Sequence, residues 1–174
     1  DAQPGGFSDH PGGKPDVFGE VADLVDLMPE VFVGRAPANT ALQAETFVRK
    51  VLSYEKNPPQ DYLLTMLFAA EVLWASPYTD QGVSKDHIGD DFVPSRFTIT
   101  KLYQRDGNEN RPSVLAAMKQ GMHIINHDGH AWSDVISVGG SMINNGDIDG
   151  LTNGLESSIL DSIGCWQAAC DRDS

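Results

Sequence analysis

Two residues whose types can do covalent chemistry, Cys165 and His130, each follow a glycine in this sequence. A thiolate is the nucleophilic form of cysteine, and a nearby histidine can supply the base or the positive charge that its formation needs. The preceding residues, Gly164 and Gly129, leave room for the backbone of a bound molecule. The pair predicts a nucleophilic site, with a buried cysteine and a strand-end histidine of no function as the other interpretation.

The histidines also allow a metal hypothesis. His123, His127 and His130 are spaced four and three residues apart, which on a helix would place them on one face. The surrounding segment 122–129, "MHIINHDG", has the character of a strand, where offsets of four and three point to opposite faces. A zinc hydrolase is therefore kept only as an alternative.

The elements that must position these residues follow from hydrophobic periodicity. The patterns predict strands over 30–37, 61–73, 96–104, 122–129 and 156–165, and helices over 39–56 and 111–121. Strands that alternate with helices predict an α/β fold with a mainly parallel sheet flanked by helices. Ligands bind beyond the carboxyl ends of the strands in such sheets. We therefore expect Glu71, the 127–130 group and Cys165 on one rim.

Local signals give these elements their ends. Asn39 or Thr40 is expected to cap the first helix, and Ser113 the second. The intervening segments 74–93 and 133–154 are polar or rich in glycine, and we expect irregular loops there.

Composition limits the classes of partner. The chain has 174 residues, an apolar fraction of 40% and a formal net charge of −13. This acidity argues against nucleic acid and anionic membranes as partners. The sequence holds no apolar run long enough to span a membrane. Residues 1–15 are rich in glycine and proline and are expected to form a flexible loop or tail.

Two smaller features concern cysteine pairing and metal binding. Cys165 and Cys170 lie too close in sequence, and are too few, to make a disulfide framework. Asn145, Asp147 and Asp149 offer oxygen ligands for calcium in "NNGDIDG", but they lack the spacing and terminal Glu of an EF-hand. An acidic, glycine-rich turn without metal is the other interpretation.

Longer motifs carry a resemblance to a known family. The segments are 28–59, "MPEVFVGRAPANTALQAETFVRKVLSYEKNPP"; 126–134, "NHDGHAWSD"; 149–154, "DGLTNG"; and 162–171, "SIGCWQAACD". In this order they resemble the gingipain-like cysteine peptidases, family C25 of the caspase-related clan. The resemblance implies a three-layer caspase-like fold, with residues 16–174 as part of a catalytic domain. The chain is then expected to be a mature product or an incomplete fragment of a longer precursor.

The resemblance also implies roles for single residues. His130 matches the catalytic histidine, Cys165 the nucleophile and Glu71 an acid that orients the histidine. The oxyanion hole would use the backbone N–H groups of Cys165 and Ala131. The family usually has glycine at the position of Ala131, and often tyrosine where this chain has His127. These two departures from the family pattern, at Ala131 and His127, put full catalytic activity in question.

Known members of this family cleave after Arg or Lys, and the resemblance implies the same specificity for this chain. An acidic group would then lie at the base of the substrate pocket, with Asp80 and Asp86 as candidates beside the cation Lys85. Gly164 and Trp166, which flank the nucleophile, are expected to contact substrate.

The expected function is thus a cysteine endopeptidase that works through a thioester. It would be secreted or exposed at the cell surface and act on proteins or peptides. It would need no cofactor for the chemistry, with structural calcium as an option. Other chains of the same processed precursor are expected as partners. The alternatives are a non-catalytic binding or assembly module and a secretion-linked sorting peptidase of the same fold.

Overall fold

The chain divides into two compact units, Asp1–Ala36 and Pro37–Ser174. A computed structural model describes residues 31, 34–36 and 38–167. The first unit has no helix or strand among its described residues. The expectations for the tail at 1–15, for half of the strand at 30–37 and for Cys170 lie outside the described residues, and the described half of that segment, residues 31 and 34–36, is not a strand.

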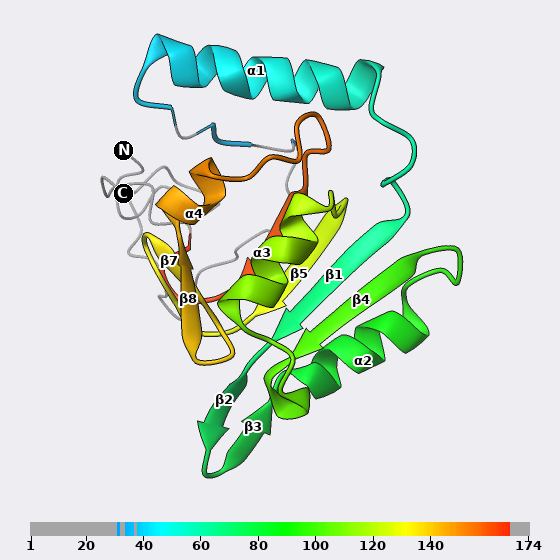
Figure 1. The fold of residues 1–174 in the computed structure, drawn as a ribbon, viewed down its shortest axis with the longest axis vertical. Helices are drawn as coiled ribbons and strands as arrows, with labels where there is room; N and C mark the ends of the chain where they lie inside the picture. Colours follow the sequence, from blue (N-terminus) through cyan, green and yellow to red (C-terminus); the bar gives the residue numbers. More distant parts are fainter. Residues whose placement is uncertain (1–30, 32–33, 37, 168–174) are drawn as a thin grey trace, which may run out of the picture. The chain divides into compact units, whose positions relative to one another are not determined.

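A four-stranded parallel sheet forms the centre of the second unit (Figure 1). Its strand order is β4-β1-β5-β9. The strands are β4 (Thr98–Tyr103), β1 (Thr65–Ala70), β5 (Ile124–Asp128) and β9 (Ile159–Ile163). This sheet confirms the predicted α/β class, and it places the carboxyl ends of β1, β5 and β9 side by side.

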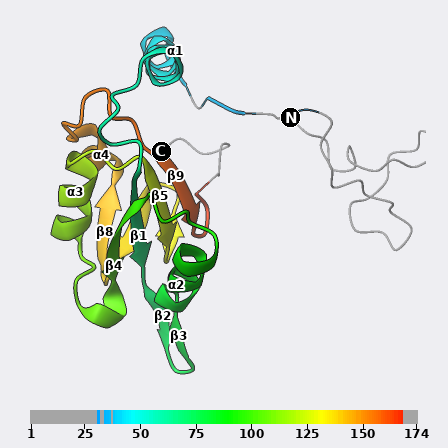
Figure 2. The ribbon, with the colours of Figure 1, turned by 90° about the vertical axis from the view of Figure 1, so that its right-hand side faces the viewer.

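Helices cover both faces of this sheet (Figure 2). Helix α3 (Arg111–Lys119) packs on the face that carries Leu67 and Ile125. Helix α2 (Gly82–Asp91) packs on the other face, where Phe68 is fully buried. Alternate residues of one strand contribute to the hydrophobic cores on the two faces of the sheet, because successive side chains point to opposite faces.

Two sequence signals at helix starts gave different results. Thr40 caps α1 (Ala41–Lys56) through a capping box with Gln43, so that helix prediction is confirmed. Asn110 caps α3, whereas Ser113 lies inside the helix and bonds back to the Asn110 backbone. The expectation that Ser113 is the cap was therefore wrong by one turn.

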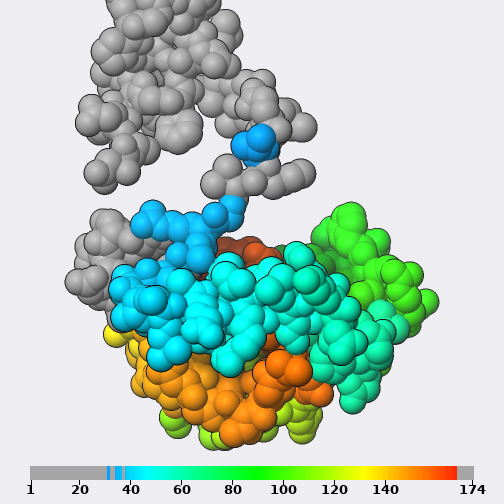
Figure 3. Space-filling view, turned by 90° about the horizontal axis from the view of Figure 1, so that it is seen from above, coloured from blue at the N-terminus to red at the C-terminus, as the bar shows by residue number. Residues whose placement is uncertain are grey.

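Helix α1 contributes no fully buried residue, although its sequence is amphipathic. Figure 3 shows it, in cyan, beside the orange segment that follows the short helix α4 (Asn145–Asp149). The Tyr54 hydroxyl bonds to Nε2 of His123 at 2.7 Å and ties the end of this helix to the start of β5.

Both segments expected to be loops contain regular structure. Residues 74–93 hold the end of β2 (Val72–Ala75), the strand β3 (Tyr78–Asp80) and helix α2. Residues 133–154 hold β7 (Val135–Val138), β8 (Ser141–Asn144) and α4. Strand β6 (Ala131–Trp132) and the 3₁₀ helix η1 (Gln104–Asp106) complete the described elements. Strands β7 and β8 bury only Ile136, Val138 and Ile143, all on one side, so the overall polarity of residues 133–154 concealed these strands.

Candidate active site

Three chemically active residues lie just beyond the strand ends. Glu71 follows β1, His130 lies two residues after β5, and Cys165 lies two residues after β9. The sheet register aligns Ala70 with Asp128, and Asp128 with Ile163. The backbone continues this alignment, because the Gly129 N–H donates to the Ile163 carbonyl at 3.2 Å. The structure therefore brings the three residues to one rim of the sheet.

Glu71 is 3% exposed, and its carboxylate holds backbone rather than an imidazole ring. Its Oε2 accepts the N–H of His130 at 2.9 Å, and its Oε1 accepts the Ser137 hydroxyl at 2.6 Å and the Gly140 N–H at 3.3 Å. A Cβ at Gly129 would lie 2.9 Å from Oε2, so this approach requires a residue without a side chain. The acid therefore ties the histidine backbone to the β7–β8 hairpin.

The His130 ring is exposed and takes its orientation from two groups that sequence reasoning missed. Its Nε2 lies 3.2 Å from the Leu73 carbonyl, and its ring meets Trp74 edge to face at 5.0 Å. A carbonyl only accepts, so Nε2 carries the hydrogen and Nδ1 of the neutral ring is unprotonated. No pattern in a sequence indicates which backbone carbonyl will orient a ring. Trp74, three residues after Glu71, was a visible signal, because an aromatic side chain so close to a predicted site residue can contact the site.

Cys165 has an exposed, unbridged thiol. A Cβ at Gly164 would lie 2.6 Å from the Cβ of Ala131 and 3.1 Å from the carbonyl oxygen of Gly129. Only a residue without a side chain allows this close contact. Gly164 therefore brings the segment of the nucleophile directly against the segment that carries His130.

Ala131 lies in a hairpin that turns its N–H outward. Ser137 donates to the His130 carbonyl at 2.8 Å, and Ala131 pairs with Ile136 at the next position. Hydrogen-bonded and non-hydrogen-bonded pairs alternate in antiparallel strands, so the Ala131 N–H faces away from β7. Trp166 is the one described residue other than glycine with positive φ. Alanine in place of the family's glycine therefore causes no backbone strain here.

The two other histidines of the metal hypothesis, His123 and His127, make hydrogen bonds within the fold. His127 is 1% exposed, donates from Nε2 to the Ser137 carbonyl and accepts the Ser162 hydroxyl at Nδ1, both at 2.8 Å. Burial lowers the pKa of its imidazole. His123 bonds to Tyr54 at the opposite end of β5. No group of three His, Cys, Asp or Glu side chains that could hold a metal occurs in the described part of the chain. This arrangement does not support the zinc alternative.

Asp80 and Asp86, the residues predicted for the base of the substrate pocket, have cationic partners within the fold, and their role in substrate binding stays a prediction. Both carboxylates pair with Arg105, and Asp86 also accepts from Lys101 at 2.6 Å. The hydrogen bond from Lys101 is the main reason that the pKa of Asp86 falls to about 2. Lys101 lies on β4, the edge opposite to the strand that leads to Cys165.

The acidic turn near α4 is also occupied by protein groups. Arg111 donates to both carboxylate oxygens of Asp147, from Nε at 3.0 Å and from Nη2. The same carboxylate accepts the Asn144 N–H at 3.1 Å. Asn145 and Asp149 are exposed on α4. The three residues proposed for calcium thus do not form a cage here, and calcium binding stays a prediction.

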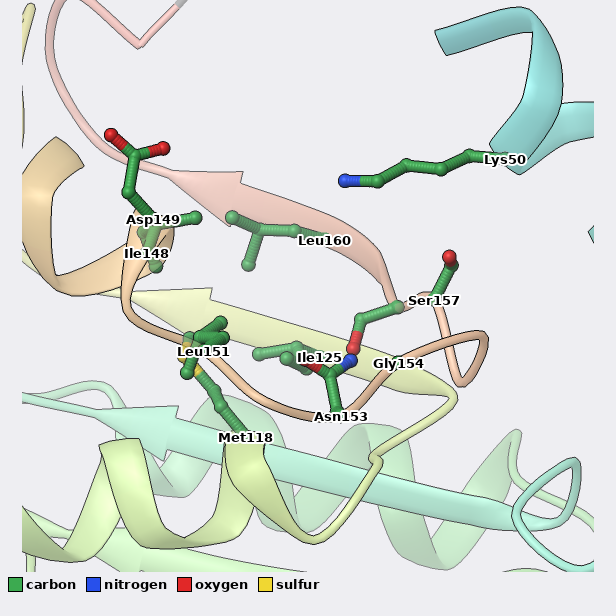
Figure 4. Close-up of a pocket in the computed structure, with 11 residues that line it drawn as sticks. Lys50, Met118, Ile125, Ile148, Asp149, Leu151, Asn153, Gly154, Ser157 and Leu160 are labelled. Atoms are coloured by element: carbon green, nitrogen blue, oxygen red, sulfur yellow. The ribbon is translucent and has the colours of Figure 1, made fainter. Parts of the chain in front are cut away.

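A cavity of about 470 Å³ lies apart from the three residues of the rim (Figure 4). Lys50 of α1 points toward it, and Ile125 and Leu160 form part of its wall. None of Cys165, His130 and Glu71 lines it. The candidate site is therefore the open rim of the sheet and not this cavity.

The parallel sheet and its rim define the class of the protein as an α/β protein with a thiol and an imidazole on adjoining segments. The model of peptidase family C25 matches residues 9–174, and the chain belongs to this family. The crystal structure of the Arg-specific cysteine proteinase gingipain R is similar, with a TM-score of 0.71 and 19% sequence identity.

The alignment with gingipain R covers 83% of this chain and 34% of that one. This chain thus spans about a third of the length of gingipain R, and the likeness confirms the caspase-like fold. A search of curated proteins found no match. The described residues include no helix that is long and apolar enough to cross a membrane.

Proposed function

We propose that this chain carries the catalytic centre of a cysteine endopeptidase, with Cys165 as nucleophile and His130 as acid and base. The contact of Gly164 with Ala131 carries the proposal, because it joins the two segments that hold these residues. The membership of the chain in family C25 supports the same chemistry.

In the proposed reaction, the Cys165 thiolate attacks the carbonyl carbon of the scissile peptide bond. The N–H groups of Cys165 and Ala131 stabilise the negative charge that develops on the carbonyl oxygen. Nδ1 of protonated His130 gives its proton to the leaving amine, and a thioester remains on the sulfur. Nδ1 then takes a proton from water, whose oxygen attacks the thioester and releases the acid and the thiolate.

Glu71 would act here through the backbone. Its carboxylate bonds the His130 N–H, while the Leu73 carbonyl holds the ring. Both contacts leave Nδ1 as the nitrogen that exchanges protons. The acid is therefore a positioning residue in this proposal.

Cleavage after Arg or Lys belongs to the proposal, although Asp80 and Asp86 are paired elsewhere. Three tryptophans, Trp74, Trp132 and Trp166, are 44–58% exposed near the rim. Aromatic faces attract guanidinium and ammonium groups, and the net charge of −13 adds a general attraction for cations.

The proposal extends to context that the family suggests. The protein would be secreted or exposed at the cell surface and would act on protein or peptide substrates. Chains from the same precursor would complete the catalytic domain, and structural calcium would bind in the complete protein. A sorting peptidase of this fold would use the same rim on a narrower set of secreted substrates.

The test uses the full chain with fluorogenic peptides that differ only in the residue before the scissile bond: Arg, Lys, Leu or Phe. Iodoacetamide labelling and mass mapping identify the reactive thiol. Cys165→Ala should abolish cleavage and labelling, whereas the control Cys170→Ala should retain both. Absence of cleavage together with equal labelling of the two cysteines would refute the proposal and favour the binding module. A preference for Leu or Phe would refute only the specificity.

A further inference from the structure

The residues directly after the nucleophile have an unusual conformation. Trp166 has φ of 63°, in the left-handed region that bulky side chains avoid. A residue holds such a conformation only where its surroundings determine it, and such residues concentrate at functional sites. The contacts of Trp166 and its neighbour therefore indicate what holds the nucleophile turn.

Two side-chain contacts join this turn to the β6–β7 hairpin. The Trp166 ring lies against the Trp132 ring, with centroids 5.0 Å apart. The Gln167 amide donates from Nε2 to the Trp132 carbonyl at 3.0 Å and to the Val135 carbonyl at 3.4 Å. These two carbonyls lie on either side of the two-residue turn of the hairpin, so the Gln167 amide is hydrogen-bonded to both β6 and β7.

The same hairpin carries the second expected oxyanion donor. Ala131 opens β6 with its N–H turned away from β7, and Gly164 lies against its Cβ. The distance between the N–H groups of Cys165 and Ala131 thus depends on how the nucleophile turn sits on the hairpin.

We propose that Gln167 and the Trp132–Trp166 pair form a clamp that seats the nucleophile turn on the β6–β7 hairpin and so sets the geometry of the oxyanion hole. The clamp residues are positioning residues and take no part in bond making. The catalytic part of this inference rests on the proposed function, whereas the seating of the turn does not.

The chemical test separates the oxyanion hole from the reactivity of the thiol. Alkylation by iodoacetamide is a displacement at a CH₂ carbon and develops no oxyanion, whereas peptide cleavage and binding of a peptide aldehyde both do. Gln167→Met keeps the length of the side chain and removes its N–H donors. We expect kcat to fall by about 10- to 100-fold and aldehyde affinity to fall in parallel. The alkylation rate and its pH profile should change less than about twofold.

Two further variants address the conformation of Trp166. Trp166→Gly and Trp166→Ala both remove the ring, but glycine adopts positive φ without strain and alanine does not. The glycine variant should therefore keep a higher kcat than the alanine variant. Gln60→Met is the matched control, since Gln60 also donates to a backbone carbonyl, that of Pro58, at an exposed site away from the rim.

Hydrogen exchange gives a measurement that needs no activity. Peptides from 129–138 should exchange faster in Gln167→Met than in the wild type or in Gln60→Met, while those from 111–119 stay unchanged. If exchange is faster in Gln167→Met but the wild type cleaves no peptide, the seating of the turn is supported and the proposed function is refuted. Unchanged exchange in Gln167→Met, or equal losses of alkylation and cleavage, would overturn the clamp whatever the wild-type activity.

Discussion

Glu109 is a buried acid that the proposed mechanism does not use. Glu109 is 3% exposed, and among the described residues its carboxyl oxygens make no hydrogen bond of good geometry, although the backbone of Gly139 lies close enough to lower its pKa in part. The residue lies against the β7–β8 turn, where a Cβ at Gly139 would come within 1.9 Å of the Glu109 carbonyl. Burial, and then the negative charge of Glu71, raise the pKa of Glu109 from 4.5 to about 8.

This shift makes the free energy of unfolding depend on pH. The folded state binds the Glu109 proton more tightly than the unfolded state, so the contribution to stability is complete below pH 4.5. It is lost as the pH rises through about 8. At roughly 1.4 kcal/mol per pKa unit the full loss is roughly 5 kcal/mol, an upper limit because a charged carboxyl can recruit water. Glu109→Gln has a similar shape and does not titrate.

The assay is urea unfolding of the wild type and Glu109→Gln at pH 5, 7 and 9. The variant should gain about 2–4 kcal/mol relative to the wild type between pH 5 and pH 9. Glu55→Gln, at an exposed position of α1, is the control and should run parallel to the wild type. A Glu109→Gln curve that also runs parallel to the wild type would refute the argument from burial.

Two other changes test the packing of the rim. Gly164→Ala should lower kcat/KM by about 100-fold, because its Cβ would meet the Cβ of Ala131 at 2.6 Å and displace the nucleophile. Adding Ala131→Gly should restore part of this loss, and no restoration would contradict the contact. Lys85→Met should lower the free energy of unfolding at pH 7 by roughly 3–5 kcal/mol, because Lys85 is 0% exposed and lies 3.6 Å from the carboxylate of Asp128. An unchanged urea midpoint would show that this ion pair contributes nothing to stability.

Residues near strand ends were the most predictable part of the site. Glu71, His130 and Cys165 each follow an apolar run, and parallel strands bring such ends to one edge of a sheet. The class of the fold was predictable for the same reason, since hydrophobic periodicity is a local property. Boundaries were less predictable, because the run 61–73 continues through β1 into β2 without a change in composition.

Partners of charged residues could not be predicted. Asp86 looked available for a cationic substrate, but the fold places Arg105 and Lys101 beside it, from 15 to 19 positions away in sequence. Coulomb attraction depends on separation in space, which the order of residues does not state.

The sequence alone determined which residues can react, the alternation of strands and helices, and the resemblance to family C25. Only the tertiary structure decided that the Leu73 carbonyl orients the His130 ring, that Glu71 holds backbone, and that Gly164 lies against Ala131. Nucleophilicity is a property of a single side chain, so the type of each residue in the sequence is enough to indicate it. Orientation comes from carbonyls, N–H groups and excluded volume, which nearly every residue shares and which only the folded chain brings together.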